Sequence, residues 1–545
     1  MHRIEKLQIV KNVSSSWFSL GVNIVVGVIL TPYILHRLGD TANGIWVLIY
    51  SVTGYYGLFD LGIRSSIVRY VSKFTATGER EELAKLINTA LFIYSCIGAV
   101  SMIVTLVVSS RVDHIFKIPP EFVGTAHWLL FMVGASVAIG FPAGVFSGFL
   151  DGLQEFYINN WTNITATILR GVFIVLALNH GYGLLMVAFI TVILPFLSFI
   201  LRAFVALWMC PIPFGFSYVN RDTFRQIANY SGVTFMIMVA GRLKWKSDEL
   251  VIGTFLSAAA ITYFNVGARI VDYAGQLVTA LSQIYVPMAS RSDARNDIQG
   301  LRKLFLLGNR VCAITIFPIC VTVLMLGKSL IECWVGKKYI ETSYPVLVIM
   351  ILCSSLWFAQ GASGRILFGR SKHGTWAVVT LMEGVANLIL SVYLVRIYGI
   401  VGDALGTAIP MTCSTLFFMP RHLCRHLGLR LSNSVRESYS LPLLLCIPLA
   451  FTLWLMRYWF VPHHFLQLVL QLLIAGTVYG LGLLWAVLSK RALAIHDYGL
   501  IEPVGVPAAL AVSAGSENFD GEKPVAEVES AEASVESADA AIPEA

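Results

Sequence analysis

Long, unbroken runs of apolar residues recur along the chain and dominate its pattern. Two of the longest are Leu91–Ser109 and Leu466–Leu488. A helix crosses a bilayer with about 20 apolar residues, so each of these runs is long enough to form a span. Because the runs are continuously apolar rather than alternating, they favour helices over the strands of a membrane barrel. The pattern therefore predicts an all-α polytopic membrane protein.

We expect about 14 transmembrane helices from these runs. They start near residues 12, 43, 84, 122, 156, 183, 229, 259, 304, 344, 374, 400, 438 and 465. Basic residues are denser in alternate connections, such as 291–303 and 421–436, than in the connections between them. Since basic loops tend to stay in the cytoplasm, this asymmetry predicts an even number of spans with both termini cytoplasmic.

Two segments far apart in the chain, Phe141–Gly152 and Phe358–Gly369, resemble each other and align at two glycines. An even number of expected spans separates the copies, which gives parallel repeats related by an axis along the membrane normal. The repeat predicts two six-helix lobes, 1–220 and 221–437, around a central cavity. Two additional helices are expected in 438–491.

Composition supports the membrane class and argues against an enzyme. Hydrophobic residues make up 57% of the chain and charged residues 13%, against about 25% charged in an average soluble domain. The nine cysteines are scattered, and no Cys/His spacing suggests a zinc site. Serine-hydrolase, P-loop and zinc-protease motifs are also missing from the sequence. We therefore expect no enzymatic activity, no cofactor and no metal site.

The two ends of the chain differ from the rest. Residues 1–11 are polar and mixed, so we expect the first span to be a retained helix rather than a signal peptide. Residues 492–545 are acidic and rich in alanine and serine, which is typical of a disordered segment. We expect this tail to be cytoplasmic and dispensable.

A dense group of charges, Gly241–Leu250, interrupts the apolar pattern near the middle of the chain. The repeat aligns this stretch with residues 24–33, which lie inside the first apolar span, so we expect it at membrane depth. A charge inside a membrane costs about 2.5–3.5 kcal/mol on insertion scales, so it is tolerated only where it is paired or faces water. The alternative is an exposed outer loop that follows a helix ending at Gly241.

On a helix, the charges of this stretch fall on two sides. Arg242, Lys246 and Glu249 share one face because they are spaced by about one turn. Lys244 and Asp248 lie on the other side, four residues apart, and can pair. We therefore expect Arg242 and Lys246 to face a water-filled cavity and to bind an anionic substrate.

Further charged pairs lie in two other expected spans. Asp60 and Arg64 are four residues apart, so they suit an internal pair or, for Arg64, a cavity role. Arg269 and Asp272 are three residues apart, so they either neutralise each other or face the cavity.

Three single charges lie in apolar segments. Arg365 follows the small residues of Gly361–Gly364, which allow neighbouring helices to approach closely. For Arg170 and Glu383 we expect packing or hydrogen-bonded roles rather than contacts with a ligand.

Five short motifs carry a family resemblance. They are Pro32–Gly39, Asn43–Trp46, Gly54–Gly62, Asp248–Gly253 and Trp334–Gly336. With these motifs the chain resembles the polysaccharide-transporter branch of the multidrug/oligosaccharidyl-lipid/polysaccharide (MOP) exporter superfamily, which includes the Wzx-type flippases.

The resemblance implies a flippase of the bacterial inner membrane that moves an undecaprenyl-diphosphate-linked oligosaccharide to the outer leaflet by alternating access. Membrane lipids and polysaccharide polymerase or export machinery are the implied partners, with no nucleic acid. The cationic positions that could hold such a substrate are Arg64, Arg242, Lys246, Arg269 and Arg365. The acidic positions that could couple an ion or proton are Asp60, Asp248, Glu249 and Asp272.

Two other functions remain open from the sequence. A drug/cation antiporter of the same superfamily would favour an acidic cavity, whereas the candidate cavity residues here are mostly basic. A membrane enzyme acting on lipid-linked sugars would need acids or histidines on a sizeable outer loop, and the expected outer loops are short.

Overall fold

The computed structural model describes residues 2–372, 374–489 and 491, and none of them forms a strand. The first half contains α1 (His2–Leu38), α2 (Asp40–Gly54), the 3₁₀ turn η1 (Tyr55–Asp60), α3 (Ile63–Thr77), α4 (Arg80–Ser109), α5 (Val112–Ile115), α6 (Pro120–Gly152), α7 (Phe156–Asn179) and α8 (Leu184–Met209). The second half contains α9 (Arg221–Lys246), α10 (Asp248–Phe255), α11 (Ala258–Ser282), α12 (Tyr285–Ala294), α13 (Ile298–Val335), α14 (Ile340–Ala359), α15 (Gly361–Gly369), α16 (Gly374–Cys413), α17 (Met419–Leu427), α18 (Leu431–Trp459) and α19 (Phe465–Leu488). The predicted all-α class is confirmed, and the predicted acidic tail, 492–545, lies outside the described residues.

Ten segments of the described chain are long and apolar enough to cross a membrane. They are α1, α4, α6, α7, α8, α13, α14, the continuous α16–α17 segment, α18 and α19. α16 is broken at Gly399, whose φ of 58° is a left-handed conformation that favours glycine. This break matches the span boundary expected near residue 400. The other expected spans fall on α2–α3, α9–α10 and α11, which are shorter or more polar than these ten segments.

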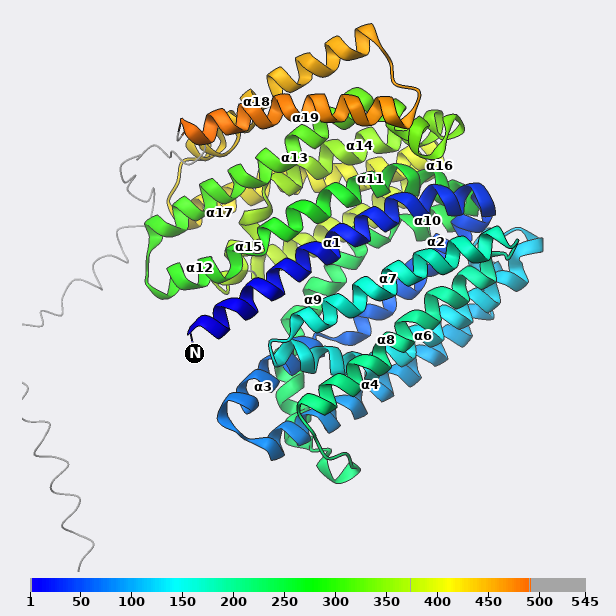
Figure 1. Cartoon of the computed structure of the whole chain (residues 1–545), viewed down its shortest axis with the longest axis vertical. Coiled ribbons are helices and arrows are strands. Elements are labelled where there is room, and N and C mark those ends of the chain that lie inside the picture. The colour runs from blue at the N-terminus through cyan, green and yellow to red at the C-terminus, as the bar shows by residue number, and fades with distance from the viewer. Residues whose placement is uncertain (1, 373, 490, 492–545) are drawn as a thin grey trace, which may run out of the picture. The chain divides into compact units, whose positions relative to one another are not determined.

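Helix contacts gather the chain into two groups (Figure 1). In the first group, α4 packs against α6, α6 against α8, and α7 against both α1 and α8. In the second group, α13 packs against α14 and α18, α11 against α14, and α9 against α16. α2 packs against α11 and joins the two groups. Fully buried side chains from both groups meet in the core at this junction, including Ile45, Ile261 and Val346.

The repeated glycines end helices in corresponding surroundings. Gly152 ends α6, and a Cβ atom added there would lie 2.6 Å from Val71 on α3. Gly369 ends α15, and a Cβ atom added there would lie 2.7 Å from Ala289 on α12. Since only glycine permits such a close approach, the same packing of a helix end against a short helix accounts for its recurrence.

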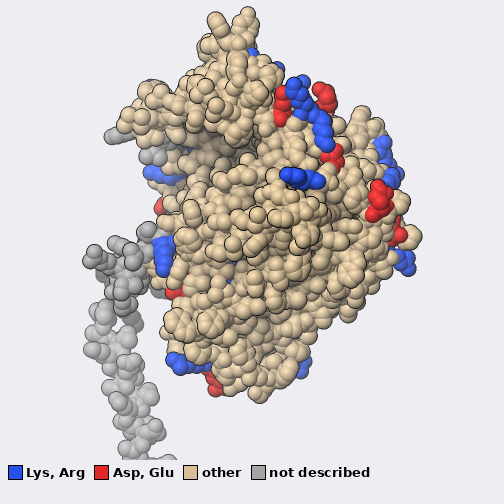
Figure 2. All heavy atoms as spheres, turned by 45° about the vertical axis from the view of Figure 1, so that its right-hand side comes forward, with Lys and Arg blue, Asp and Glu red and all other residues tan. Residues whose placement is uncertain are grey.

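The surface is largely apolar. Figure 2 shows charged side chains mostly towards the two sides of the view, with few on the broad surface between them. Large hydrophobic residues such as Trp208, Ile447 and Leu473 are exposed on helices that are long enough to span a membrane. Soluble monomers rarely expose contiguous apolar surface on this scale. The protein is therefore a multi-pass membrane protein.

Candidate functional site

The charged stretch Gly241–Leu250 is helical and lies among other helices. α9 ends at Lys246, Ser247 forms the junction, and α10 starts at Asp248. α9 packs against α16, and α10 packs against α2, α11 and α16. Asp248 and Glu249 are buried as a result. The alternative of an exposed outer loop is therefore wrong.

Four basic side chains line one cavity of about 620 Å³, which we name the cationic chamber. They are Arg170 on α7, Arg242 and Lys246 on α9, and Arg269 on α11. Among the described residues that line the chamber, Glu249 is the single carboxylate, and its Oε1 lies 3.6 Å from Lys246 Nζ. The chamber thus carries an excess of positive charge. The sequence did not indicate the place of Arg170, because an isolated arginine has no spacing that links it to other helices.

Two glycines of the Gly54–Gly62 motif make room for the guanidinium of Arg242. A Cβ atom added at Gly57 would lie 2.8 Å from Nη2 of Arg242, and one added at Gly54 would lie 3.7 Å from Nη1. The hydroxyl of Tyr55 also donates a hydrogen bond to the Arg242 carbonyl at 3.5 Å. The motif therefore positions one of the chamber's cations from the neighbouring helix.

Arg269 and Asp272 face different cavities although they are close in sequence. Arg269 lines the cationic chamber, and its buried Nε makes no hydrogen bond within the described chain. Asp272 lines a neighbouring cavity together with Lys246. No ion pair joins Arg269 to Asp272 in the part of the chain that the structure describes, so their mutual neutralisation is not found.

Asp60 and Arg64 do not pair with each other. Asp60 accepts a hydrogen bond from Tyr94, whereas Arg64 Nη2 contacts Asp151 Oδ2 at 2.8 Å. The reason is a break between them, since Leu61 has a φ of 51° and interrupts the helix that would have placed them on one face. Neither residue is among those that line the cationic chamber.

Arg365 lies in a separate cavity of about 240 Å³. Gln360 and Trp376 line the same cavity, and neither of them lines the cationic chamber. The structure therefore groups three of the five predicted cations, Arg242, Lys246 and Arg269, and places Arg64 and Arg365 elsewhere.

Lys244 pairs with Glu383 rather than with Asp248 as expected. The contact joins Lys244 Nζ to Glu383 Oε1, and both side chains are almost fully buried. α16 packs against α9 and brings Glu383 to this position, while Asp248 takes a different partner. Lys244 is therefore a buried structural charge and faces away from the chamber.

Asp248 belongs to a buried polar group between α10 and α16. Thr407 Oγ1 lies 2.9 Å from Asp248 Oδ1 and 3.0 Å from Asn387 Oδ1. Asp403, also on α16, is fully buried, and neither carboxylate oxygen makes a hydrogen bond within the described residues. A buried carboxylate without partners is unfavourable unless it is protonated or holds a cation. Asp403 had no sequence signal, because nothing in the pattern links it to Asp248.

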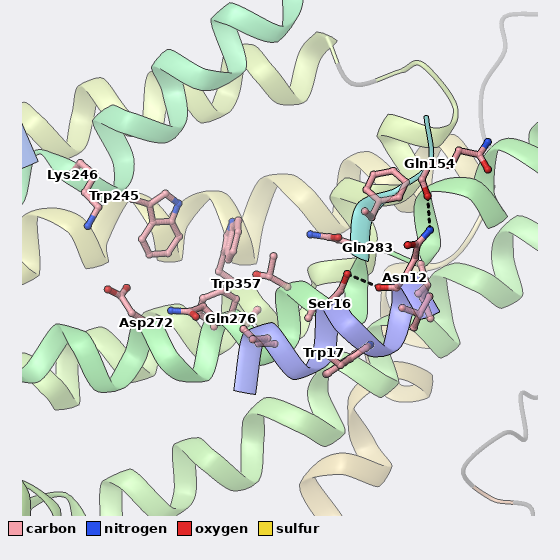
Figure 3. A pocket seen from close by; sticks show the side chains of 18 residues that line it. Asn12, Ser16, Trp17, Gln154, Trp245, Lys246, Asp272, Gln276, Gln283 and Trp357 are labelled. Carbon is pink, nitrogen blue, oxygen red and sulfur yellow. Dashed lines mark hydrogen bonds between the residues drawn. The ribbon is translucent and has the colours of Figure 1, made fainter. Parts of the chain in front are cut away.

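A second cavity, which we name the vestibule, adjoins the cationic chamber and has a volume of about 920 Å³. Figure 3 shows Lys246 and Asp272 at one end, Trp245, Trp357 and Gln276 in the middle, and Asn12 and Gln154 at the other end. Lys246 and Gln276 line both cavities. The two cavities therefore meet at these two residues.

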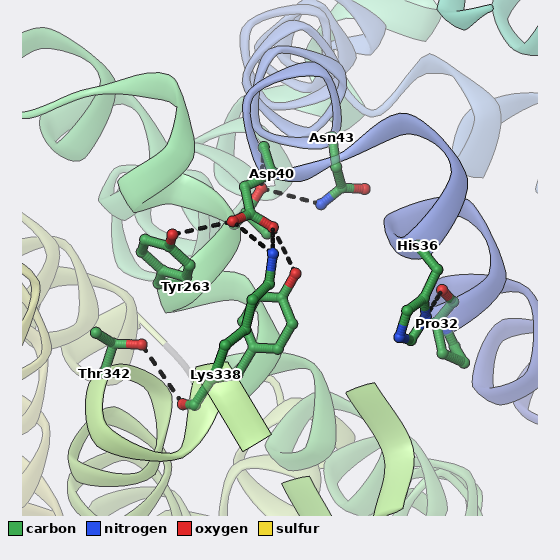
Figure 4. Close-up of polar contacts among 9 residues, drawn as sticks. Pro32, His36, Asp40, Asn43, Tyr263, Lys338 and Thr342 are labelled. Atoms are coloured by element: carbon green, nitrogen blue, oxygen red, sulfur yellow. Dashed lines mark hydrogen bonds and ion pairs between the residues drawn. The ribbon is translucent and has the colours of Figure 1, made fainter. Parts of the chain in front are cut away.

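Asn12 lies near the start of α1. Near the other end of α1, one carboxylate joins the two helix groups (Figure 4). Asp40 on α2 accepts hydrogen bonds from the hydroxyls of Tyr263 at 2.9 Å and Tyr339 at 2.5 Å. Lys338 Nζ lies 3.0 Å from both carboxylate oxygens. We name these four residues the latch. The sequence did not single out Asp40, because its partners come from distant parts of the chain.

Two further contacts close the same end. Trp334 Nε1 donates to the Val28 carbonyl at 2.8 Å, and Lys117 Nζ donates to the Phe255 carbonyl at 2.6 Å. Each contact joins the first helix group to the second. The latch end is thus held shut.

Two solved structures that this chain resembles are a flippase and a transporter. A lipid II flippase, MurJ, in an inward closed conformation aligns with a TM-score of 0.68 and 16% identity, over 88% of this chain and 99% of that chain. An inward-facing multidrug resistance MATE family transporter of the MOP superfamily aligns with a TM-score of 0.62 and 14% identity, over 75% and 94%. These likenesses show that the chain shares the fold of these two proteins.

The sequence comparisons define the family. A family model described as polysaccharide biosynthesis protein matches residues 9–293, and the chain belongs to this family. A candidate O-antigen transporter of Shigella flexneri is 20% identical over 75% of this chain and 96% of that protein. A probable low-salt glycan biosynthesis flippase of Haloferax volcanii is 24% identical over 35% of this chain and 40% of that protein. The resemblance carried by the motifs is confirmed.

Proposed function

We propose that this protein is a flippase that moves a polyprenyl-diphosphate-linked oligosaccharide from the inner to the outer leaflet of a bacterial inner membrane. The observation that carries the proposal is the cationic chamber. Its four basic side chains face one carboxylate, which suits a ligand with more than one negative charge. The names of the relatives, an O-antigen transporter and a glycan flippase, support the same substrate class.

The chemistry of such a substrate explains the need for the two cavities. Each sugar hydroxyl moved into hydrocarbon without a partner costs about 4–8 kcal/mol, so a polar path is required. The diphosphate needs cations, and the planar guanidinium of arginine can bind its oxygens in a bidentate manner. Arg170, Arg242 and Arg269 supply three such groups in the chamber.

The proposal includes the topology. About 14 spans would form two six-helix lobes, 1–220 and 221–437, with two further helices in 438–491 and both termini in the cytoplasm. α2–α3, α9–α10, α11 and the second part of α16 would supply the spans beyond the ten apolar segments. The vestibule then opens towards the cytoplasm and the latch closes the outer side. Rocking of the lobes would open the latch and expose the chamber to the other leaflet.

We also propose that Asp248 and Asp403 couple transport to a proton or small cation. Both carboxylates are buried, and the oxygens of Asp403 make no hydrogen bond within the described chain. Asp248 is one residue from Glu249, which lines the chamber. Occupancy of this group can therefore bias the same α9–α10 junction that carries the cations.

The drug/cation antiporter alternative fits the chamber less well. A cationic drug would meet four basic groups and one carboxylate, and like charges in a site of low dielectric repel strongly. An enzyme acting on lipid-linked sugars is not favoured either, because the relatives are named as a transporter and a flippase.

Reconstitution in liposomes tests the proposed function. A fluorescent undecaprenyl diphosphate oligosaccharide is flipped by the wild-type protein, and a membrane-impermeant quencher reports which leaflet holds it. We expect Arg242→Ala or Lys246→Ala to lower the rate about tenfold or more, which corresponds to at least about 1.4 kcal/mol. Arg242→Lys should recover only part of the rate, because it keeps the charge and loses the planar fork.

The control is Lys337→Ala, which removes an exposed lysine outside the chamber. It should flip the lipid at the wild-type rate. If the chamber variants also flip the lipid normally, the cationic chamber does not bind the diphosphate and the proposed function is wrong.

A further inference from the structure

The vestibule is chemically unlike the cationic chamber that it adjoins. Its lining includes the aromatic rings of Trp245 and Trp357 and the side-chain amides of Gln276 and Gln283. Among the described residues that line it, the charged side chains are Lys246 and Asp272, and both lie at the end next to the chamber. Most of the vestibule is therefore uncharged.

Two tryptophans form a firm wall on one side of the vestibule. The ring centroids of Trp245 and Trp357 are 5.3 Å apart, and the rings are inclined at 70°, an edge-to-face arrangement that stabilises aromatic pairs. Lys244 Nζ lies 4.7 Å from the Trp357 centroid and 5.4 Å from the Trp245 centroid. The buried pair of Lys244 with Glu383 therefore packs against these rings, and neither charged residue lines the vestibule.

Polar groups on α11 form a stripe along the same cavity. Asp272, Gln276, Thr279 and Gln283 all line the vestibule, and their spacing of three or four residues places them on one helix face. The side chains of Gln276 and Gln283 are exposed and make no hydrogen bond to other described residues. Each amide therefore offers both a donor and an acceptor to a ligand.

This combination matches the surface of an uncharged sugar. A hexose ring has an apolar face of C–H groups that can lie on an aromatic ring, and a rim of hydroxyls that donate and accept hydrogen bonds, as amides do. Beyond Lys246, which lies next to the chamber, the described residues that line the vestibule include no cation, so an acidic sugar there would bring in an unpaired carboxylate. Burial of an unpaired carboxylate is strongly unfavourable.

We propose that the vestibule is a binding subsite for the uncharged sugar units nearest the diphosphate, and that it selects glycans whose first units are neutral. This inference rests on the proposed function, with the diphosphate in the cationic chamber. Lys246 and Gln276 line both cavities, so they mark the place where diphosphate and first sugar meet. The volume of about 920 Å³ lies at the upper end of the range for ligand cavities, roughly 300–1,000 Å³, which suits more than one sugar unit.

The test compares three probes in liposomes that contain the purified full-length protein. They are undecaprenyl diphosphate without sugar, the same lipid with three uncharged hexoses, and the same lipid with a uronic acid as its second sugar, away from Lys246. We expect the wild-type protein to bind the neutral trisaccharide about tenfold more tightly than the bare diphosphate, a difference of about 1.4 kcal/mol. The acidic analogue should bind no better than the bare lipid.

The variants are Gln283→Leu and Trp357→Leu, separately and together. Gln283→Leu keeps the size of the side chain, and Trp357→Leu keeps an apolar side chain but removes the ring; thermal unfolding in detergent verifies that both variants fold. They should remove most of the preference for the neutral trisaccharide and leave binding of the bare diphosphate unchanged. Gln283→Arg should raise binding of the acidic analogue about tenfold.

Two results would overturn the subsite. One is an unchanged preference for the neutral trisaccharide in the double variant, and the other is equal binding of the neutral and acidic lipids by the wild-type protein. Failure of the proposed function looks different, because the wild-type protein would then bind no undecaprenyl diphosphate at all, or Arg242→Ala would not weaken that binding.

Discussion

At the scale of single residues, the cations of the central stretch divide into two kinds. Arg242 and Lys246 line the cationic chamber, whereas Lys244 is 2% exposed and pairs with Glu383. A buried ion pair adds little net stability, but removal of one partner leaves a charge in a dry interior. We therefore assign Lys244 to the support of the tryptophan wall and the other two residues to substrate binding.

The first prediction concerns Lys244. Lys244→Met should destabilise the protein by about 3–5 kcal/mol, because Glu383 is left buried without its partner. The double variant Lys244→Met with Glu383→Gln should regain much of this loss, since the uncompensated charge is gone and Ser414 keeps a hydrogen-bond acceptor. Thermal unfolding of the purified variants measures both effects. A single variant as stable as the wild type would contradict the assignment.

The second prediction concerns the glycine beside Arg242. Gly57→Ala should displace the Arg242 guanidinium, since the added Cβ would lie 2.8 Å from its Nη2. We expect flipping in liposomes to fall several-fold, with the amount of folded protein in the membrane unchanged. Gly124→Ala is the matched control, because nothing lies within 4 Å of a Cβ atom added there. Equal rates for the two variants would show that Gly57 does not position the arginine.

At the scale of elements, the sequence predicted helices and their faces better than their partners. It placed Arg242, Lys246 and Glu249 on one face of a helix at membrane depth, and the structure brings these three residues to one cavity. It missed the partner of Lys244, because Glu383 reaches it through the packing of α16 against α9. Spacing along one helix predicts an ion pair correctly only where no residue of another helix lies closer to the charge.

The loss of the predicted Asp60–Arg64 pair has a different physical cause. The spacing of four residues implies a pair only on a continuous helix. Leu61 and Gly62 both have positive φ, so η1 ends and α3 begins between the two charges. A sequence pattern cannot show this break, because Leu61 is not a residue that usually marks one.

The third prediction concerns the latch. Asp40→Asn removes the carboxylate that holds Lys338, Tyr263 and Tyr339, so the outer end should open more often. Spin labels on the outer ends of α2 and α14, in a cysteine-free background, should report a larger population of long distances. The control is Asp293→Asn, which breaks an ion pair with Arg370 inside the second helix group. An unchanged distance distribution for Asp40→Asn would mean that the latch does not hold the outer side closed.

At the scale of the whole molecule, the class and the family could be predicted from the sequence, because they depend on properties summed over many residues. Hydropathy and the short motifs indicated a polytopic member of the polysaccharide-transporter branch, and the fold and family comparisons agree. The sequence could not show which of the basic residues line the cationic chamber. Arg64 and Arg365 lie outside the chamber and Arg170 lies inside it, because the lining of a cavity depends on how distant helices pack.

The fourth prediction concerns the topology that links these scales. The outer side is defined here by the latch end, where Lys117 contacts the Phe255 carbonyl, and the inner side by the basic connection that includes Arg425 and Arg430. A reporter inserted between α17 and α18 should therefore read cytoplasmic, and one inserted between α5 and α6 should read periplasmic. Paired fusions to a fluorescent protein and to alkaline phosphatase measure both sites, since the first is active only inside the cell and the second only outside. The same reading from both sites would require an even number of crossings between them, and the latch could not then be the outer gate of an alternating-access cycle.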